Sequence, residues 1–238
     1  MMGSCKLSLN GEHAWRIFGD PGTNSLTART HMAKRNPEKT RKNILDAAVK
    51  EFAGAGLGGA RIDRIAEESG CNKRMIYHYF GSKDGLYQEV LTALYTEMRQ
   101  HELAIELDEA NPVDALVELA DRTFDFFVQR PEFIRILNDA NLTQSQPSAE
   151  TGPRGDLTAD LIRQIAQLLD KGQKAGTVRA GLDATQLYVS IAGLGYFYLS
   201  NGYTLGALFQ RDLLAAPEIE VRRDHVRAAV QAIVREPQ

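Results

Sequence analysis

The sequence predicts an all-α protein in which a three-helix N-terminal head is joined to a larger helical body. From Pro37 onward, apolar residues recur at the spacing of amphipathic helices, and hardly any stretch alternates as a strand would. Helix start and stop signals, mainly Pro, Asn and Gly, flank these periods. The predicted domains are a flexible arm over residues 1–36, a head over 37–81 and a body over 82–238.

The arm is aperiodic and contains no apolar run of signal-peptide length. The most apolar segment, Leu187 to Leu199, is too short to cross a bilayer, so we expect a cytoplasmic protein without a membrane partner. Cys5 and Cys71 lack the spacing of a disulfide framework or a zinc motif, which also fits a reducing compartment. Because Met32 opens a stretch that also has the form of a chain start, the sequence leaves open whether residues 1–31 belong to the natural protein and are ordered.

Three helices are predicted in the head. The first begins at Pro37 and is expected to end at Gly54 and Gly56. The second covers residues 61–69, and the third covers 72–80 from an Asn that suits an N-cap. One short helix following another through a glycine turn is the layout of a helix-turn-helix, whose second helix enters the major groove of DNA.

The body is predicted to consist of helices separated by breaks rich in Pro, Gly and Ser. They cover residues 82–103, 112–127, 133–141, 157–175, 184–201 and 218–235. Residues 143–155 contain too much Pro, Gly, Ser and Gln to pack and are expected to form a loop. The helix over 184–201 has almost no polar face, so it must be buried on more than one side.

Charge separates the head from the body. Residues 33–81 hold ten Lys and Arg against six Asp and Glu, whereas residues 82–238 hold fifteen against twenty-three. A basic module joined to an acidic one suits a protein whose N-terminal part meets a polyanion. The charge difference alone also allows an interpretation without functional meaning, in which the solvated helix faces of the two parts merely differ in net charge.

The third head helix combines an apolar face with a face suited to DNA. If Ile76 turns inward, Arg74 and His78 lie on the opposite face. Arg and Lys bond guanine edges or phosphates, Tyr and His bond phosphate oxygens, and Met can touch a thymine methyl. The residues predicted to contact DNA from this helix are Lys73, Arg74, Met75, Tyr77 and His78.

The stretches TRKNILDAAVKEFAGAG and RIDRIAEESGCNKRMIYHYFGSKDGLY closely resemble the N-terminal domain of TetR-type (TetR/AcrR) transcriptional regulators. The resemblance implies an all-helical homodimer with a DNA-binding head and a ligand-binding body. By position it implies phosphate contacts for Thr40 and Lys83. Where many relatives carry Thr at the start of the second helix, this chain has Ala60 and Arg61, so Arg61 is expected to contact phosphate directly.

The resemblance therefore implies a ligand-responsive regulator that binds a palindromic operator as a homodimer, most often as a repressor that a small molecule releases. The residues predicted to line the effector site are Tyr95, Met98, Phe124, Phe127, Phe133, Arg135 and Asn138. This mixture suits a small, partly apolar ligand, such as an aromatic acid whose charge meets Arg135. Aromatic residues at helical spacing are also typical of an ordinary core, and that alternative stays open.

Dimerisation is assigned to the two C-terminal helices. The predicted interface residues are Leu187, Ile191, Leu194, Tyr198, Val226 and Val230, with an intramolecular core as the alternative. We expect no metal, because His101 and Glu102 diverge on a helix and lack a third ligand, and no cofactor. We expect no enzyme, because no nucleophile, base and orienting group come together. A constitutive DNA-binding protein and an enzyme with a DNA-targeting head remain as alternatives, and the effector, the operator and the sign of regulation stay open.

Overall fold

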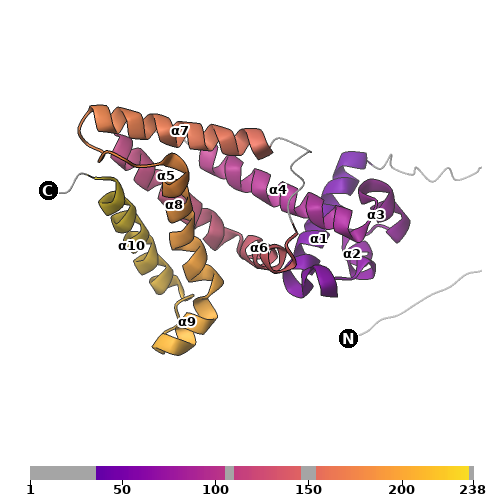
Figure 1. Ribbon diagram of the computed structural model, residues 1–238. Helices are drawn as coiled ribbons and strands as arrows, with labels where there is room; N and C mark the ends of the chain where they lie inside the picture. The colour runs from indigo at the N-terminus through magenta and orange to yellow at the C-terminus, as the bar shows by residue number, and fades with distance from the viewer. Residues whose placement is uncertain (1–35, 105–109, 146–153, 236–238) are drawn as a thin grey trace, which may run out of the picture. The chain divides into compact units, whose positions relative to one another are not determined.

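The computed structural model describes residues 36–104, 110–145 and 154–235 (Figure 1). Within these ranges the chain forms ten α-helices and no strand, which confirms the all-α prediction. The helices are α1 (Pro37–Gly59), α2 (Ile62–Ser69), α3 (Lys73–Phe80), α4 (Lys83–Leu103), α5 (Pro112–Gln129), α6 (Pro131–Thr143), α7 (Arg154–Lys174), α8 (Ala184–Ser200), α9 (Gly202–Phe209) and α10 (Ala216–Val234). None of these helices is long and apolar enough to span a membrane. The arm predicted over residues 1–36 lies outside the described residues, apart from Asn36.

The head is formed by α1, α2 and α3, as predicted, and it packs on α4. Two of its helix ends have a clear local cause. Asn36 accepts a hydrogen bond from the Glu38 N–H at the beginning of α1. Gly70 ends α2 with a φ of 64°, a conformation that glycine adopts without strain. The core of the head consists of the buried side chains Ile44, Phe52, Ile65, Ile76 and Phe80.

A kink at Gly56 distinguishes α1 from the predicted first helix. Gly54 and Gly56 were expected to end that helix, but α1 continues to Gly59, with non-helical angles only at Gly56 (φ 66°, ψ 174°). The kink is held by α6, because the Leu57 N–H donates to Asp139 Oδ2 at 2.9 Å. A Cβ on Gly56 would lie 2.5 Å from Asp139 Oδ1, so the position requires glycine. A contact with the body thus overrides the local stop signal.

Apolar packing does not stop at residue 81, where the head was predicted to end. Buried side chains of the head form one cluster with those of α4 and α6, including Leu94 and Ile136. A second cluster joins α5, α7, α8 and α10, with Ile165 and Val230 among its members. Because close-packed interiors transmit small displacements, a shift of α4 or α6 is expected to move the helices of the head that pack against them.

The short helix α9 was not predicted. It follows α8 almost directly at the Asn-Gly pair of residues 201–202, which reads as a turn in the sequence. Both of its glycines allow close approach of the next segment. A Cβ on Gly202 would lie 2.4 Å from the Leu214 side chain, and one on Gly206 would lie 2.8 Å from the Arg211 carbonyl oxygen. These glycines therefore allow residues 210–215 to fold back against the helix.

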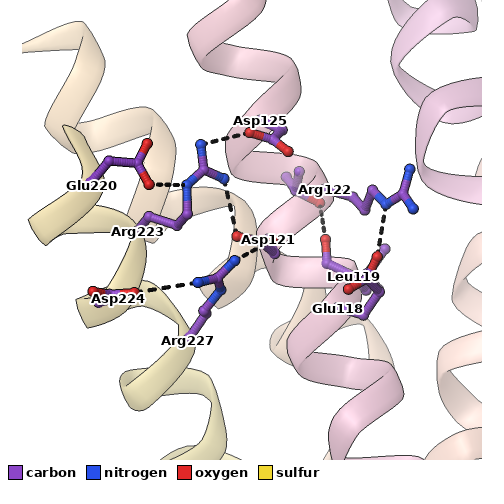
Figure 2. A network of polar contacts seen from close by, with 10 residues as sticks. Glu118, Leu119, Asp121, Arg122, Asp125, Glu220, Arg223, Asp224 and Arg227 are labelled. Carbon is purple, nitrogen blue, oxygen red and sulfur yellow. Dashed lines mark hydrogen bonds and ion pairs between the residues drawn. The ribbon is translucent and has the colours of Figure 1, made fainter. Parts of the chain in front are cut away.

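An ion-pair network joins α10 to α5 (Figure 2). Arg223 on α10 contacts Asp121 Oδ1 at 3.1 Å and Asp125 Oδ1 at 2.7 Å, both on α5. Arg227, one turn further along α10, contacts the other oxygen of Asp121 at 2.8 Å. Burial alone would raise the pKa of Asp121, but the hydrogen bonds from Arg227 and Arg223 outweigh it and lower the pKa below its ordinary value. The network fixes the last helix on the centre of the body.

Candidate DNA interface and effector pockets

Helix α3 is held at both ends so that one face is free for contact. The Asn72 side chain accepts a hydrogen bond from the Met75 N–H at 2.9 Å, which caps the first turn. Gly81 ends the helix with a positive φ of 73°. Ile76 and Phe80 are buried in the head, which fixes the rotation of the helix about its axis. The opposite side is therefore presented to solvent.

The outward face of α3 carries the predicted DNA-contacting residues. Lys73, Arg74 and His78 are exposed, and Tyr77 keeps 46% of its surface accessible. Met75 is half-buried at the edge of this face. The geometry is that of a helix able to lie in a major groove, with two bases and two hydrogen-bonding rings outward.

Three other predicted phosphate contacts lie around α3 in different environments. Lys83 donates to the Gly58 carbonyl oxygen at 3.3 Å, so it bridges the start of α4 to the end of α1. Arg61 is exposed before the first turn of α2, where its backbone N–H donates to Glu51 Oε1 at 2.9 Å. Thr40 is only 7% exposed, so its side chain has little surface to offer a phosphate. The three residues therefore differ in how readily they could reach a DNA phosphate, and Arg61 is the most accessible of them.

The junction between α3 and α4 is tight. Ser82 caps α4 by accepting a hydrogen bond from the Gly85 N–H at 2.9 Å. A Cβ on Gly85 would lie 2.2 Å from the Phe80 carbonyl oxygen, so the two helices meet without space between them. Arg41 on α1 forms an ion pair with Glu89 on α4. A change in the direction of α4 is thus passed directly to α3.

Four of the seven predicted effector residues line one pocket between α4, α5, α6 and α8, here called the aromatic pocket. They are Tyr95, Met98, Phe127 and Phe133, and the pocket has a volume of about 330 Å³. The Phe127 and Phe133 rings are nearly parallel, with centroids 6.0 Å apart, and Tyr95 meets Phe133 edge-on at 5.4 Å. Tyr196 of α8 also lines this pocket. The wall is therefore a set of rings suited to a flat apolar guest.

A buried polar cluster closes one end of the aromatic pocket, and the sequence analysis did not select its members. Arg99 and Tyr188 both line the pocket. Arg99 Nη1 donates to Glu102 and to the Tyr188 hydroxyl, and Glu102 also accepts from Thr123 at 2.8 Å. Burial alone would lower the pKa of Arg99, but the interactions with Tyr188 and Glu102 raise it, so the guanidinium stays charged. Burial also raises the pKa of Tyr188 above its usual range, which keeps the hydroxyl neutral.

The remaining predicted effector residues lie elsewhere. Arg135 and Asn138 line a second pocket of about 460 Å³, which shares only Phe127 with the predicted aromatic wall. Phe124 lines neither pocket, because it is buried against α8, where a Cβ on Gly195 would meet its ring at 3.1 Å. The placement of Phe124 in the ligand site is therefore corrected to the core, and Arg135 is separated from most of the aromatic wall.

Two neighbouring residues of α6 connect the pockets to the head. Asn138 accepts hydrogen bonds from the Tyr196 and Ser200 hydroxyls of α8. Asp139 accepts from the Tyr87 hydroxyl of α4 at 2.7 Å and from the N–H of Leu57, beside the kink of α1. Burial and the hydrogen bond to Asp139 raise the pKa of Tyr87, so this hydroxyl remains a donor. One turn of α6 thus contacts α8, α4 and α1.

The structure divides the predicted interface residues into two groups. Leu187, Ile191, Val226 and Val230 are at most 2% exposed within the single chain, so they are corrected to its own core, the alternative that the sequence left open. Leu194 and Tyr198 are only half-buried. The large apolar side chains exposed on α8 and α10 and on α9 between them are Val189, Phe197, Tyr203, Leu208, Phe209 and Val221. Periodicity alone did not show which side of an apolar helix its own domain covers.

No group of three or more His, Cys, Asp and Glu able to hold a metal occurs in the described ranges. Comparison with known proteins then gives a consistent picture. A family model for "Bacterial regulatory proteins, tetR family" matches residues 44–90, and one for "Tetracyclin repressor-like, C-terminal domain" matches residues 112–230. The matched ranges include α2 and α3 of the head and α5 to α8 of the body.

Among curated proteins, the chain is 37% identical over 187 residues to the HTH-type transcriptional repressor NicS of Pseudomonas putida, covering 79% of this chain and 88% of that protein. It is 36% identical over 158 residues to the HTH-type transcriptional repressor SCO4008 of Streptomyces coelicolor, covering 66% and 76%. Among solved structures, the transcriptional regulator SCO4942 of Streptomyces coelicolor superposes with a TM-score of 0.63 at 28% identity, covering 83% of this chain and 99% of that one.

Proposed function

The chain belongs to the TetR family of bacterial transcriptional regulators, and from this premise we propose that it is a repressor that binds a palindromic operator as a homodimer and is released by a small molecule. Helix α3 supports the proposal most directly. Its inward face is fixed by Ile76 and Phe80, while Lys73, Arg74 and His78 are exposed. These are the groups that read base edges and hold phosphates. Lys73 also forms an ion pair with Asp63 of α2 at 2.5 Å. Such a regulator acts on the chromosome, in the bacterial cytoplasm.

A homodimer follows from the size of the DNA target. A single α3 reads only half a site, and two such helices must reach major grooves about 34 Å apart. We assign the interface to the exposed apolar side chains Phe197 on α8 and Val221 on α10, together with half-buried Leu194 and Tyr198. Large apolar groups left exposed on neighbouring helices favour association.

Release by a ligand is supported by the path from the pockets to the head. Helix α4 lines the aromatic pocket with Tyr95 and continues from α3, whereas α6 lines both pockets and holds the α1 kink through Asp139. A ligand that binds one arrangement of these helices better shifts the population of head positions. By linkage, operator DNA must change ligand affinity by the same factor. The pockets favour this sensor over the constitutive DNA-binding protein that the sequence also allowed.

Selection of bound sequences from a random DNA duplex library tests the proposal. We expect enrichment of an inverted repeat with half-sites one helical turn apart, bound by two copies of the chain. Enrichment of a single half-site bound by one copy, or no enrichment at all, would refute the proposed mode of action. The selected duplex then serves as the operator for all further measurements.

A further inference from the structure

The geometry points to a specific ligand chemistry for the aromatic pocket: a planar aromatic carboxylate of one or two rings, whose carboxylate is bound by Arg99. The inference rests on the proposed function, because it names the effector class of the same sensor. It differs from the expectation drawn from the sequence, since Arg99 takes the role given there to Arg135.

The rings of the pocket favour a flat ligand. Phe127 and Phe133 lie nearly parallel, and Tyr95 and Tyr196 approach them edge-on from α4 and α8. Aromatic guests gain from offset stacking and from edge contacts with such rings. The volume of about 330 Å³ is at the small end of ligand pockets, which span roughly 300 to 1,000 Å³, so it fits one or two fused rings.

Arg99 offers an anchor for an acceptor at the polar end of this pocket. Its Nη1 donates to Glu102 and Tyr188, and its Nε donates to Thr158 at 3.2 Å. Within the described part of the chain, no hydrogen bond or ion pair engages Nη2, which carries two further donors. The fixed bonds orient the guanidinium before the ligand arrives, so little is lost in ordering it.

A carboxylate satisfies these donors better than a neutral acceptor does, because its charge adds Coulomb attraction to the charged guanidinium and its two oxygens can accept parallel N–H bonds from it. Arg99 is 6% exposed, so solvent screens its charge much less than that of exposed Arg135. Glu102 pairs with Arg99 and balances its charge, which explains how a charged group stays buried at this position.

Gly193 provides a way to close the pocket without disturbing the ion pair. It lines the pocket from α8, and a Cβ built on it meets no atom within 4 Å. A larger side chain at this position therefore occupies pocket space and not packed core. Gly193→Val removes ligand volume while leaving Arg99 and Glu102 in place.

The experiment compares 2-naphthoate and benzoate with their uncharged amides, using calorimetry on the full chain. We expect each acid to bind at least about tenfold more tightly than its amide. Gly193→Val should weaken naphthoate binding about tenfold or more. Replacing the pair together, Arg99→Met with Glu102→Gln, should abolish the preference for acid over amide. Arg163→Met on the exposed side of α7 removes an arginine with no expected change.

Equal affinities for acid and amide, no binding of either acid at millimolar concentration, or loss of acid binding on Arg135→Met with the Arg99 variant unaffected would each overturn the inference. If circular dichroism shows that the double variant does not fold, Gly193→Val and the acid and amide pairs decide the question. Binding of the ligand-free protein to its selected operator is measured in parallel. Intact operator binding without acid binding would defeat the ligand assignment alone, whereas absent operator binding would defeat the proposed function.

Discussion

The head and the body of this chain place their functional chemistry differently. In the head, the candidate DNA-reading groups Lys73, Arg74, Tyr77 and His78 lie on a single short helix and are exposed. In the body, the aromatic pocket takes its walls from four helices, with Tyr95 and Tyr196 far apart in the chain. A local sequence pattern is enough to predict the exposed face of α3, whereas the aromatic pocket forms only when the four helices have packed together.

The largest expected effect separates core from interface in the body. Ile191→Ala should lower the free energy of unfolding by about 2–5 kcal/mol, because it opens a cavity in the chain's own core. Phe197→Asp, on the exposed side of the same helix, should leave the helical content unchanged and yield a monomer. Chemical denaturation and light scattering measure the two. A dimer that survives Phe197→Asp would show that α8 does not contribute this side to the interface.

The next effect sharpens the assignment of roles within the head. Arg74→Ala should weaken operator binding by about 1–3 kcal/mol and relax base preference, because a base-edge contact is lost. Lys83→Ala should weaken operator and random duplex alike and reduce the salt slope by about 1. Titration of both variants at several salt concentrations distinguishes them. If the two variants behaved identically, the division into base and phosphate contacts would be wrong.

A smaller effect concerns the connection between the two regions. Asp139→Asn keeps the shape of the side chain but weakens its hydrogen bonds to Tyr87 and Leu57, so stability should fall by about 1 kcal/mol. The factor by which ligand weakens operator binding should fall as well. Operator titration with and without ligand measures this factor for both proteins. An unchanged factor would mean that the signal reaches the head through α4 alone.

The smallest effect is a pH dependence confined to the body. The pKa of Asp121 in the folded chain lies below its ordinary value of 3.8, because the bonds from Arg227 and Arg223 outweigh burial. A lowered folded pKa contributes stability above the ordinary value, and this contribution disappears as the pH falls through the folded pKa. Asp121→Asn should therefore be less stable at neutral pH and lose less on acidification. Chemical denaturation at neutral pH and below pH 4 measures the free energy of unfolding of both proteins. An equal loss of stability on acidification in the two proteins would contradict this role.

Most helices and the recognition helix could be predicted from the sequence, because periodicity, capping residues and glycine stops act locally. The prediction failed where distant contacts decide. The sequence predicted that the first helix ends at Gly56, but Asp139, more than eighty residues later, holds the kink, and α1 continues beyond it. Ile191 of α8 and Val230 of α10 lie on apolar helix faces, yet the sequence of such a face does not reveal whether its own domain or a second subunit covers it.

The effector site shows the same limit. Of the aromatic residues chosen, Tyr95, Phe127 and Phe133 line one pocket, whereas Phe124 is buried in the core. Arg99 was not considered and Glu102 was considered only as a metal ligand, although the two lie three residues apart on α4, a spacing at which side chains of a helix meet. Only the packing of α8 against α4 brings Tyr188 to them and turns the pair into the end of a pocket.

The close contact between Gly56 and Asp139 has a genetic consequence. The positive φ of residue 56 disfavours any residue but glycine, and a Cβ there would lie 2.5 Å from Asp139 Oδ1. A Gly56→Ala allele would strain the kink and displace the Asp139 carboxylate, which bonds Tyr87 of α4 and the Leu57 N–H of α1, in the same place where the ligand's influence is proposed to arrive. Cells carrying it are expected to express the repressed genes without any effector. A single missense mutation would then have the same effect on expression as an inducer.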